Sequence, residues 1–336
     1  MSAATQRAQT IRIHAYGGPE QLSCEFVDVP APGPGEVQIR QHAVGINYLD
    51  TYHRRGVFPL PSLPGNLGVE GAGEIAALGE GVDGFRVGDR VAYAGRPLGS
   101  YSSLRNMPAR ILLRLPDEIT YEQAAAATLQ GLTVHMLLRR VTRLGSQDTI
   151  LVHAAAGGLG SLLTQWARTI GCRVLGTVGS PEKAELARGN GCHEVILYNK
   201  ENFTDGVRRL TDGAGVDAVF EGLGGDIFHE SLTILKPFGH LVSLGQVAEG
   251  LPSVSLADLG PARSLSVSVP GVFAYIHTHP DLQGAADDVF RAIATGRLKV
   301  RIGGRYPLAR AEDAHRALQS RGTTGSLILI PNLDPS

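Results

Sequence analysis

The chain has 336 residues, of which 43% are hydrophobic and 19% charged, and its formal net charge is -1 at neutral pH. This length predicts about two domains, and the near-neutral charge without a basic run argues against nucleic acid or an anionic membrane as the main partner. No segment reaches the roughly 20 apolar residues that cross a bilayer, and the first residues lack the hydrophobic run of a signal peptide. We therefore expect a cytoplasmic protein.

Residues up to about 110 predict an irregular, β-rich region. They are rich in glycine and proline and contain the strand-like runs IRIHAY, EVQIRQHAVGI, GEIAALG and DRVAYAG. Near Pro116 the pattern changes, because YEQAAAATLQGLTVHMLLRRV carries helix formers and an apolar stripe. This run predicts a helix that is interrupted at Gly131.

Strands and helices then alternate along the chain. TILVHA, RVLGTV, EVILY, DAVFE and HLVSLG are strand-like, and the first three are each followed by a helical pattern. This alternation predicts right-handed βαβ crossovers and a parallel sheet. After about residue 270 we expect helices over 282–295 and 311–319 and a final strand, SLILI.

A glycine turn lies at the first strand–helix junction, in LVHAAAGGLGSLLTQWAR (151–168). Gly157, Gly158 and Gly160 leave the backbone open to a phosphate, and the helix start offers unpaired N–H groups and partial positive charge. Ala155 stands where the first glycine of GxGxxG belongs. The position at the first junction of a repeated αβ pattern nevertheless favours a dinucleotide site.

The end of the second strand favours NADPH. An NAD-selective fold carries an Asp or Glu about 20 residues after the turn, whereas this strand ends in Gly179 and Ser180 and is followed by Lys183. A carboxylate would repel a 2′-phosphate, while a small polar turn with a cation attracts it. The alternative is that Lys183 is a solvated helix residue paired with Glu182 or Glu185.

Several motifs in order resemble the zeta-crystallin-like NADPH:quinone oxidoreductases, which belong to the zinc-free side of the medium-chain dehydrogenase/reductase superfamily, and the bacterial type above all. The resemblance covers nearly the whole chain and is carried by GGPE (17–20), GINYLDTYHRRGVFP (45–59), GDRVAY (88–93), GSYSS (99–103), AAGGLGSLLTQWAR (155–168), EQAAAATLQGLTVHMLLRR (122–140) and SRGTTGSLIL (320–329).

The resemblance implies an α/β fold with a GroES-like β-rich catalytic domain and a Rossmann NADPH-binding domain. We place the catalytic domain at 1–125 and 269–336 and the Rossmann domain at 126–268. NADPH would lie in the cleft between the domains and hold a small-molecule quinone against its nicotinamide. Members usually pair through their Rossmann sheets, so a homodimer is expected.

The resemblance also implies which residues contact NADPH. The nicotinamide end would be lined by Asn47, Tyr48, Asp50 and Tyr52, with Thr133 at the carboxamide or a nearby phosphate. The pyrophosphate would meet Gly157, Gly158, Leu159 and Gly160. The 2′-phosphate would meet Gly179, Ser180, Lys183, Tyr198 and Arg321. Two further loops would contribute Leu223, Gly224, Leu244, Gly245 and Gln246. Without the resemblance, Tyr198 is a strand-end aromatic residue and Arg321 a surface cation.

The metal ligands of the zinc alcohol dehydrogenases in this superfamily are missing. Asn47 stands where the early cysteine belongs and Val69 where a histidine belongs, so Glu70 alone is left, whereas a catalytic zinc keeps three protein ligands. His277 and His279 form a pair on a loop without a third ligand. The three cysteines give no metal pattern either, since Cys24, Cys172 and Cys192 are scattered and lack CxxC spacing. We expect them to be buried. We expect no metal.

Without a Lewis acid, alcohol oxidation lacks help in removing the hydroxyl proton, whereas a quinone accepts a hydride readily once it is positioned. Tyr52 is the candidate catalytic hydroxyl, with Asn47 orienting it; alternatively, both residues only pack the domain interface. NADPH-dependent quinone reduction is the favoured activity. The alternatives are an NADPH-dependent enone or 2-alkenal reductase and a non-enzymatic NADPH-binding protein, crystallin-like or RNA-binding.

Overall fold

The computed structural model describes residues 5–245 and 252–332, and the chain forms two compact units. Unit 1 consists of Met1–Leu132 and Phe273–Ser336, and unit 2 is Thr133–Val272. No helix in the described ranges combines the length and the apolar character that a membrane span requires.

Unit 2 contains a six-stranded parallel sheet with the strand order β11-β10-β9-β12-β13-β14. Strand β10 shows why this sheet forms here, since five of the six residues of RVLGTV are buried, as expected for a strand covered on both faces. The strands are β9 (Thr149–Val152), β10 (Arg173–Val178), β11 (Glu194–Leu197), β12 (Val216–Glu221), β13 (Leu235–Ser243) and β14 (Ser266–Ser268).

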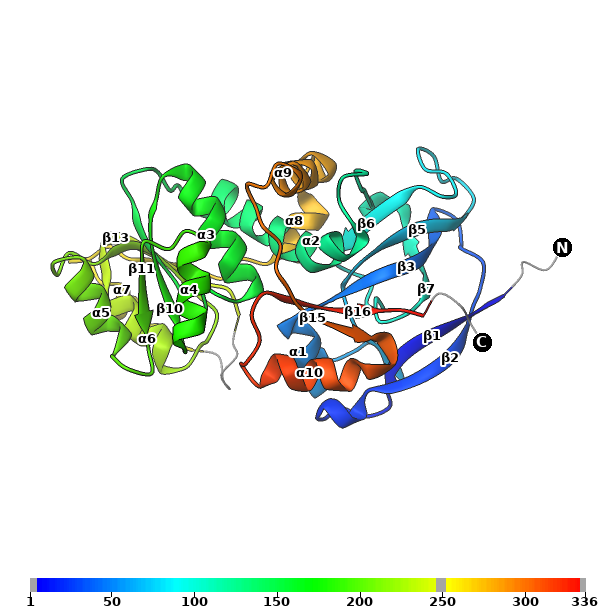
Figure 1. Cartoon of the computed structure of the whole chain (residues 1–336), viewed down its shortest axis with the longest axis horizontal. Helices are drawn as coiled ribbons and strands as arrows, with labels where there is room; N and C mark the ends of the chain where they lie inside the picture. The colour runs from blue at the N-terminus through cyan, green and yellow to red at the C-terminus, as the bar shows by residue number, and fades with distance from the viewer. Residues whose placement is uncertain (1–4, 246–251, 333–336) are drawn as a thin grey trace. The chain divides into compact units, whose positions relative to one another are not determined.

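Helices cover both faces of this sheet (Figure 1). The chain moves outward from β9 to β10 and β11 and then returns to β12 on the other side of β9. Because such crossovers are right-handed, the helices of the two halves lie on opposite faces. The helices are α3 (Gly158–Ile170), α4 (Pro181–Gly189), α5 (Phe203–Leu210), α6 (Asp226–Thr233) and α7 (Leu256–Leu259). The turns after β9 and β12 thus flank the point where the strand order reverses, which is where doubly wound sheets bind ligands.

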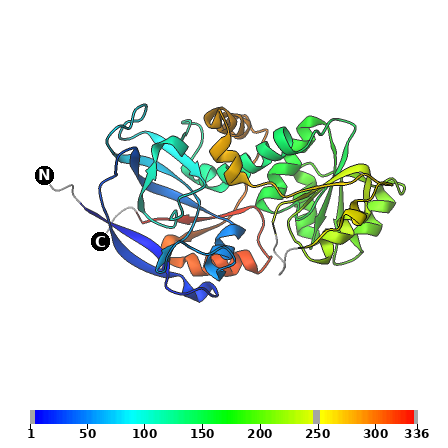
Figure 2. The same cartoon turned by 180° about the vertical axis from the view of Figure 1, so that it is seen from behind.

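Unit 1 is built on two mainly antiparallel sheets. The larger has the order β15-β16-β3-β5-β6-β8, with β7 also paired to β3, and the smaller has the order β2-β1-β4. The strands are β1 (Gln6–Ile13), β2 (Ser23–Val29), β3 (Glu36–Ile46), β4 (Gly65–Asn66), β5 (Glu70–Leu78), β6 (Arg90–Ala94), β7 (Leu104–Pro108), β8 (Leu113–Arg114), β15 (Ile302–Pro307) and β16 (Ser326–Ile330). Strand β16 pairs with β3, so the end of the chain completes the amino-terminal sheet (Figure 2).

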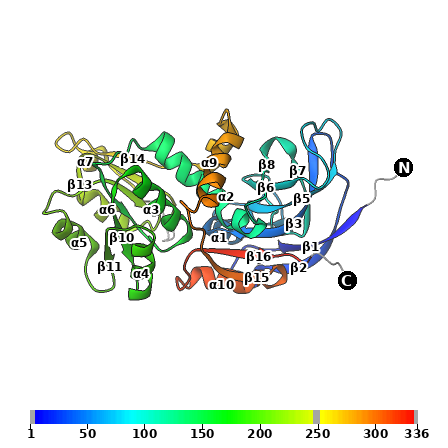
Figure 3. The ribbon, with the colours of Figure 1, turned by 45° about the horizontal axis from the view of Figure 1, so that its top comes forward.

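The helices of unit 1 include α1 and α10, which frame the part of the site described below. Helix α10 packs against β15 and β16 (Figure 3), because its apolar stripe of Ala311, Ala314 and Leu318 faces a core that includes Ile13 and Leu327. The longer helices are α1 (Tyr48–Arg55), α2 (Tyr121–Met136), α8 (Val272–Thr278), α9 (Leu282–Ala294) and α10 (Ala311–Gln319). Short turns of 3-10 helix cover Pro19–Gln21, Ala109–Ile111 and Leu308–Arg310, and a π-helical turn, Leu137–Val141, follows α2.

Three local expectations were wrong. Helix α2 runs through Gly131 without a break, because this glycine is there to let α9 approach: a Cβ on it would lie 2.4 Å from Cγ1 of Val289. His277 lies in the last turn of α8 and not in a loop. Cys24 is exposed, because it lies on β2, whose pairing to β1 leaves alternate residues facing outward.

We expect Gly131→Ala to lower the melting temperature. The added methyl group overlaps Val289, and overpacking costs about 1–3 kcal/mol, more than the about 1 kcal/mol that alanine gains over glycine within a helix. Gly189→Ala in α4 is the matched control, because a Cβ there meets no heavy atom within 4 Å. Thermal unfolding followed by circular dichroism compares them, and a Gly131→Ala protein as stable as the control would contradict this account.

Candidate functional site

The glycine turn of unit 2 connects β9 to α3. Ala154 in this turn has a φ of 51°, and a Cβ on Gly160 would lie 2.4 Å from the carbonyl oxygen of Ala154, so only glycine fits there. Gly157 is the N-cap of α3 and makes no side-chain cap hydrogen bond, and the first turn, with Gly158, Leu159 and Gly160, holds no acidic residue. The start of α3 therefore keeps its N–H groups and partial positive charge for an anion.

Four of the residues expected at the 2′-phosphate come together after β10. Ser180 is the N-cap of α4, and its hydroxyl oxygen accepts a hydrogen bond of 3.3 Å from the backbone N–H of Lys183. A Cβ on Gly179 would lie 2.5 Å from the hydroxyl oxygen of Tyr198, which is 47% exposed. The bare backbone at Gly179 thus lets the tyrosine hydroxyl approach closely. Glu185, one of the two alternative partners named for Lys183, forms an ion pair of 2.6 Å with Arg188.

The loop after β12 is organised by a buried carboxyl group that sequence reasoning missed. Oε1 of Glu221 accepts hydrogen bonds from the backbone N–H groups of Leu223 and Gly224, and the Glu221 carbonyl accepts one of 2.6 Å from Leu244. Glu221 is fully buried, its Oε2 has no hydrogen-bond partner among the described residues, and burial raises the pKa of its carboxyl. Leu244 and Gly245 follow β13 directly, while Gln246 lies outside the described residues.

His153 was also missed, and it lies one residue after β9. Its ring nitrogens contact Oγ1 of Thr177 at 2.9 Å and Oγ of Ser231 at 3.1 Å, which ties β9 to β10 and α6. Burial lowers the pKa of His153 to about 4. This neutral ring therefore holds the chain just before the glycine turn against β10 and α6.

In unit 1, Asn47 is the N-cap residue of α1 and is held by two buried carboxyl groups. Its backbone N–H donates to Oδ2 of Asp50 at 2.8 Å, and its side-chain amide donates to Oε2 of Glu70 at 2.8 Å. The other oxygen of Glu70 accepts a hydrogen bond of 2.6 Å from the backbone N–H of Leu129 in α2. The structure thus directs the Asn47 amide to Glu70, which connects α1 to β5 and α2.

The remaining expected residues of unit 1 differ in accessibility. Asp50 is fully buried, so its side chain acts from inside the fold. Tyr52 is partly exposed, and its ring meets that of Phe58 edge to face with the centroids 5.7 Å apart. Tyr48 donates to the carbonyl of Leu318 at 2.9 Å; burial raises the pKa of Tyr48, while the nearby charge of Arg321 lowers it. Tyr48 and Arg321 therefore lie near one another.

Thr133 lies in α2 and is partly exposed.

The residues fit NADPH better than they fit a metal. Unit 2 offers a helix start without a side-chain cap, a bare glycine backbone beside a tyrosine hydroxyl, and Lys183 in the first turn of the next helix, all suited to phosphate groups. In residues 5–245 and 252–332, no group of three or more His, Cys, Asp or Glu is arranged to hold a metal ion. At the position of the missing zinc ligands, Asn47 offers an amide that is hydrogen-bonded to Glu70, and Val69 has no donor atom.

The pH dependence of stability follows from the buried carboxyl groups. Burial raises the pKa of Glu70 to about 8 from 4.5 and that of Asp50 to about 7 from 3.8. Between the unfolded and folded values, unfolding releases protons from these two groups, so their contribution to stability is lost as the pH rises through the folded values. The buried neutral rings of His153 and His315, whose pKa values are lowered from 6.5, act in the opposite direction below about pH 6.5.

We therefore expect the melting temperature to fall between about pH 6.5 and pH 9 and this slope to be smaller in Glu70→Gln. Glu74→Gln is the control, because this half-exposed carboxylate lies on the same strand beside Arg40. Thermal unfolding across the pH range measures both slopes. Equal slopes in wild type and Glu70→Gln would show that Glu70 does not titrate in this window.

Comparisons with known proteins agree with this geometry. The model of the "Zinc-binding dehydrogenase" family matches residues 158–288, and that of the "Alcohol dehydrogenase GroES-like domain" matches residues 33–117. A quinone oxidoreductase of Pseudomonas aeruginosa is 46% identical, over 96% of this chain and 100% of that protein. A 2-haloacrylate reductase of a Burkholderia species is 38% identical, over 95% of this chain and 98% of that protein.

The crystal structure of Escherichia coli quinone oxidoreductase complexed with NADPH superposes with a TM-score of 0.93 at 40% identity, covering 96% of this chain and 100% of that one. The expected α/β fold, with a GroES-like domain and a Rossmann domain, is confirmed. The chain belongs to the quinone oxidoreductase family of the medium-chain dehydrogenases/reductases.

Proposed function

We propose that this protein reduces quinones with NADPH. The observation that carries the proposal is full-length identity of 40–46% to quinone oxidoreductases, one of them solved with NADPH. The phosphate-compatible turns of unit 2 supply the physical basis. NADPH, when bound, supplies the hydride that the quinone accepts.

Unit 2 would hold the dinucleotide. The start of α3 receives the pyrophosphate, because its backbone N–H groups are not used by a side-chain cap. Gly179 and Lys183 receive the 2′-phosphate together with the hydroxyl groups of Ser180 and Tyr198. Leu223 and Gly224 contribute contact surface and not N–H donors, since Glu221 already accepts from both of their N–H groups.

Unit 1 would supply the groups that meet the nicotinamide end and the acceptor. The phenol of Tyr52 is the candidate hydrogen-bond donor to an acceptor oxygen, because it is partly exposed and carries an ionisable hydroxyl. Asn47 orients this segment through Glu70. Arg321, which the sequence assigns to the 2′-phosphate, lies near Tyr48. Zinc takes no part in this proposal, since Asn47 and Val69 replace the ligands that it would need.

A second candidate activity is NADPH-dependent reduction of an activated alkene. It is favoured by the 38% identity to a 2-haloacrylate reductase along almost the full length. The cofactor residues would be the same, and the Tyr52 hydroxyl would hydrogen-bond the enolate oxygen. The two candidates differ in how much they require of that hydroxyl.

A homodimer, a cytoplasmic location and the domain limits 1–125, 126–268 and 269–336 stay predictions. Strand β14 supports the homodimer, because it is an edge strand of the sheet in unit 2 and is followed by Val269, which is 77% exposed. An edge strand of this kind can pair with that of a second copy.

We expect rapid NADPH oxidation with small quinones and slower turnover of 2-alkenals and 2-haloacrylate. Dialysis against a chelator should leave the quinone rate unchanged, because no zinc ligand set is present in the sequence. Steady-state rates followed by NADPH absorbance measure both. Strong alkenal turnover beside negligible quinone turnover would replace the first candidate with the second, and loss of the rate on chelation would contradict zinc independence.

We expect Lys183→Ala to weaken NADPH binding about tenfold and to leave NADH binding unchanged, since a charge-assisted hydrogen bond contributes about 1.5–3 kcal/mol. Fluorescence titration measures both dissociation constants. Lys236→Ala is the matched control, because Lys236 pairs with Asp217 at 2.7 Å near the amino ends of β12 and β13, away from the turns. Equal affinity of the wild type for NADPH and NADH would refute the assignment of the 2′-phosphate site.

A further inference from the structure

Arg54 in α1 is a buried cation without a direct counter-charge. Its side chain is only 1% exposed. It donates hydrogen bonds to the carbonyl of Gly17 at 3.1 Å, to Nδ1 of His315 at 2.8 Å and to Oε1 of Gln319 at 3.0 Å. None of these three acceptors is a carboxylate. Burial lowers the pKa of Arg54, and the nearby carboxylate of Glu20 raises it.

Two neutral side chains connect Arg54 to the buried carboxyl group of Asp50. Tyr101 donates its hydroxyl proton to Oδ2 of Asp50 at 2.9 Å, and the same hydroxyl lies 2.8 Å from Nε2 of His315. Because the tyrosine proton is used on Asp50, Nε2 of His315 must carry the proton and donate to the tyrosine oxygen. Nδ1 is then bare and accepts from Arg54. Burial and the charge of Arg54 lower the pKa of His315 to about 3, in keeping with a neutral ring.

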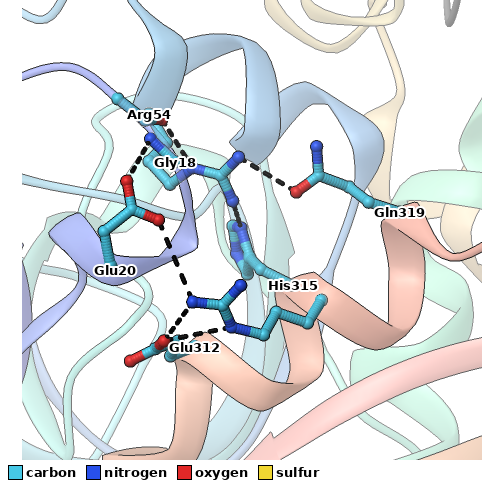
Figure 4. Close-up of polar contacts among 8 residues, drawn as sticks. Gly18, Glu20, Arg54, Glu312, His315 and Gln319 are labelled. Atoms are coloured by element: carbon cyan, nitrogen blue, oxygen red, sulfur yellow. Dashed lines mark hydrogen bonds and ion pairs between the residues drawn. The ribbon is translucent and has the colours of Figure 1, made fainter.

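These four residues form one continuous chain of hydrogen bonds, Asp50–Tyr101–His315–Arg54, and all four are at most 1% exposed. Its two ends, Asp50 and Arg54, both belong to α1, while Tyr101 comes from the loop before β7 and His315 from α10. Figure 4 shows the Arg54 end, where His315 and Gln319 of α10 point toward the guanidinium. Outside it, Arg316 bonds Glu312 at 2.6 Å and approaches Glu20 at 3.9 Å.

We propose that this buried chain positions the segment Asn47–Tyr52 for reaction, so that Tyr101, His315 and Arg54 are positioning residues of the reductase. The mechanical link is Oδ2 of Asp50, which accepts from both Tyr101 and the backbone N–H of Asn47. A change at Tyr101 or His315 therefore reaches Asn47 through a single atom. The inference rests on the proposed function, because it concerns the part of the site assigned there to the nicotinamide and the acceptor.

The test separates positioning from general destabilisation. The variants are Tyr101→Phe, which removes the central hydroxyl, His315→Leu, which breaks the chain, and His315→Gln, whose amide can donate at one end and accept at the other. We expect the first two to lower kcat/KM for a quinone at least about tenfold and His315→Gln to recover most of it. Binding of 2′,5′-ADP, which probes unit 2 alone, should stay within roughly twofold of wild type in all three.

The matched control is Tyr93→Phe. Tyr93 is another fully buried tyrosine of unit 1, and its hydroxyl donates to Gln41 and not to α1. We expect this variant to lose melting temperature and to keep its quinone kinetics. If Tyr101→Phe and His315→Leu also keep wild-type kinetic constants, the chain is structural only and the inference is wrong.

Two further outcomes are decisive. If His315→Leu does not fold, the same kinetic and binding measurements are made on Tyr101→Phe and Gln319→Leu. Each of these variants removes a single polar group from the chain or its surroundings. Loss of kcat/KM together with 2′,5′-ADP affinity in these variants would overturn positioning in favour of global destabilisation. A wild-type protein that binds NADPH but reduces no quinone would refute the proposed function instead.

Discussion

The start of α1 depends on two buried carboxyl groups, Asp50 and Glu70, which both accept hydrogen bonds from Asn47. One accepts from its backbone and the other from its side-chain amide. Burying such groups is unfavourable unless their hydrogen bonds are made, and an unmatched one costs about 1–3 kcal/mol. The segment Asn47–Tyr52 can therefore keep one conformation only while β5, α2, the loop before β7 and α10 all stay in place around it. The site assigned to the acceptor is thus a product of the whole of unit 1.

Unit 2 is proposed to bind phosphate groups mainly with its backbone, and close packing shapes its turns. Gly160 lies so near Ala154, and Gly179 so near Tyr198, that neither position has room for a side chain. His153 connects the end of β9 to β10 and α6, and Glu221 holds the loop after β12. Charge at the surface of these turns then selects the nucleotide, while the buried groups set their shape.

Local sequence signals predicted the elements of the fold well. Helix α10 and strand β16 have the expected limits, since an apolar stripe and a short apolar run each act over a few neighbouring positions. The break at Gly131 was wrong because the role of that glycine is set by Val289, which is distant in the sequence. The chain from Asp50 to Arg54 lay beyond prediction for the same reason: it joins residues 214 and 261 positions apart. The only signal was a histidine within the apolar stripe of α10, and a buried histidine has many possible partners.

The replacement of zinc ligands by Asn47 and Val69 also limits the chemistry that this site can perform. A site built from amide, phenol and buried carboxyl groups offers hydrogen bonds and orientation but no strong electrophile. It therefore suits acceptors that are reactive without one. A quinone is such an acceptor because its reduced oxygen is stabilised by the ring. It requires little more than alignment with the nicotinamide. An activated alkene gains an enolate oxygen and depends more on a donor such as Tyr52. The contact of Tyr52 with the partly exposed ring of Phe58 bears on both, since it fixes where the phenol can reach. The choice between the two acceptors thus rests on the placement of one hydroxyl group, and that placement is controlled by the buried hydrogen bonds behind it.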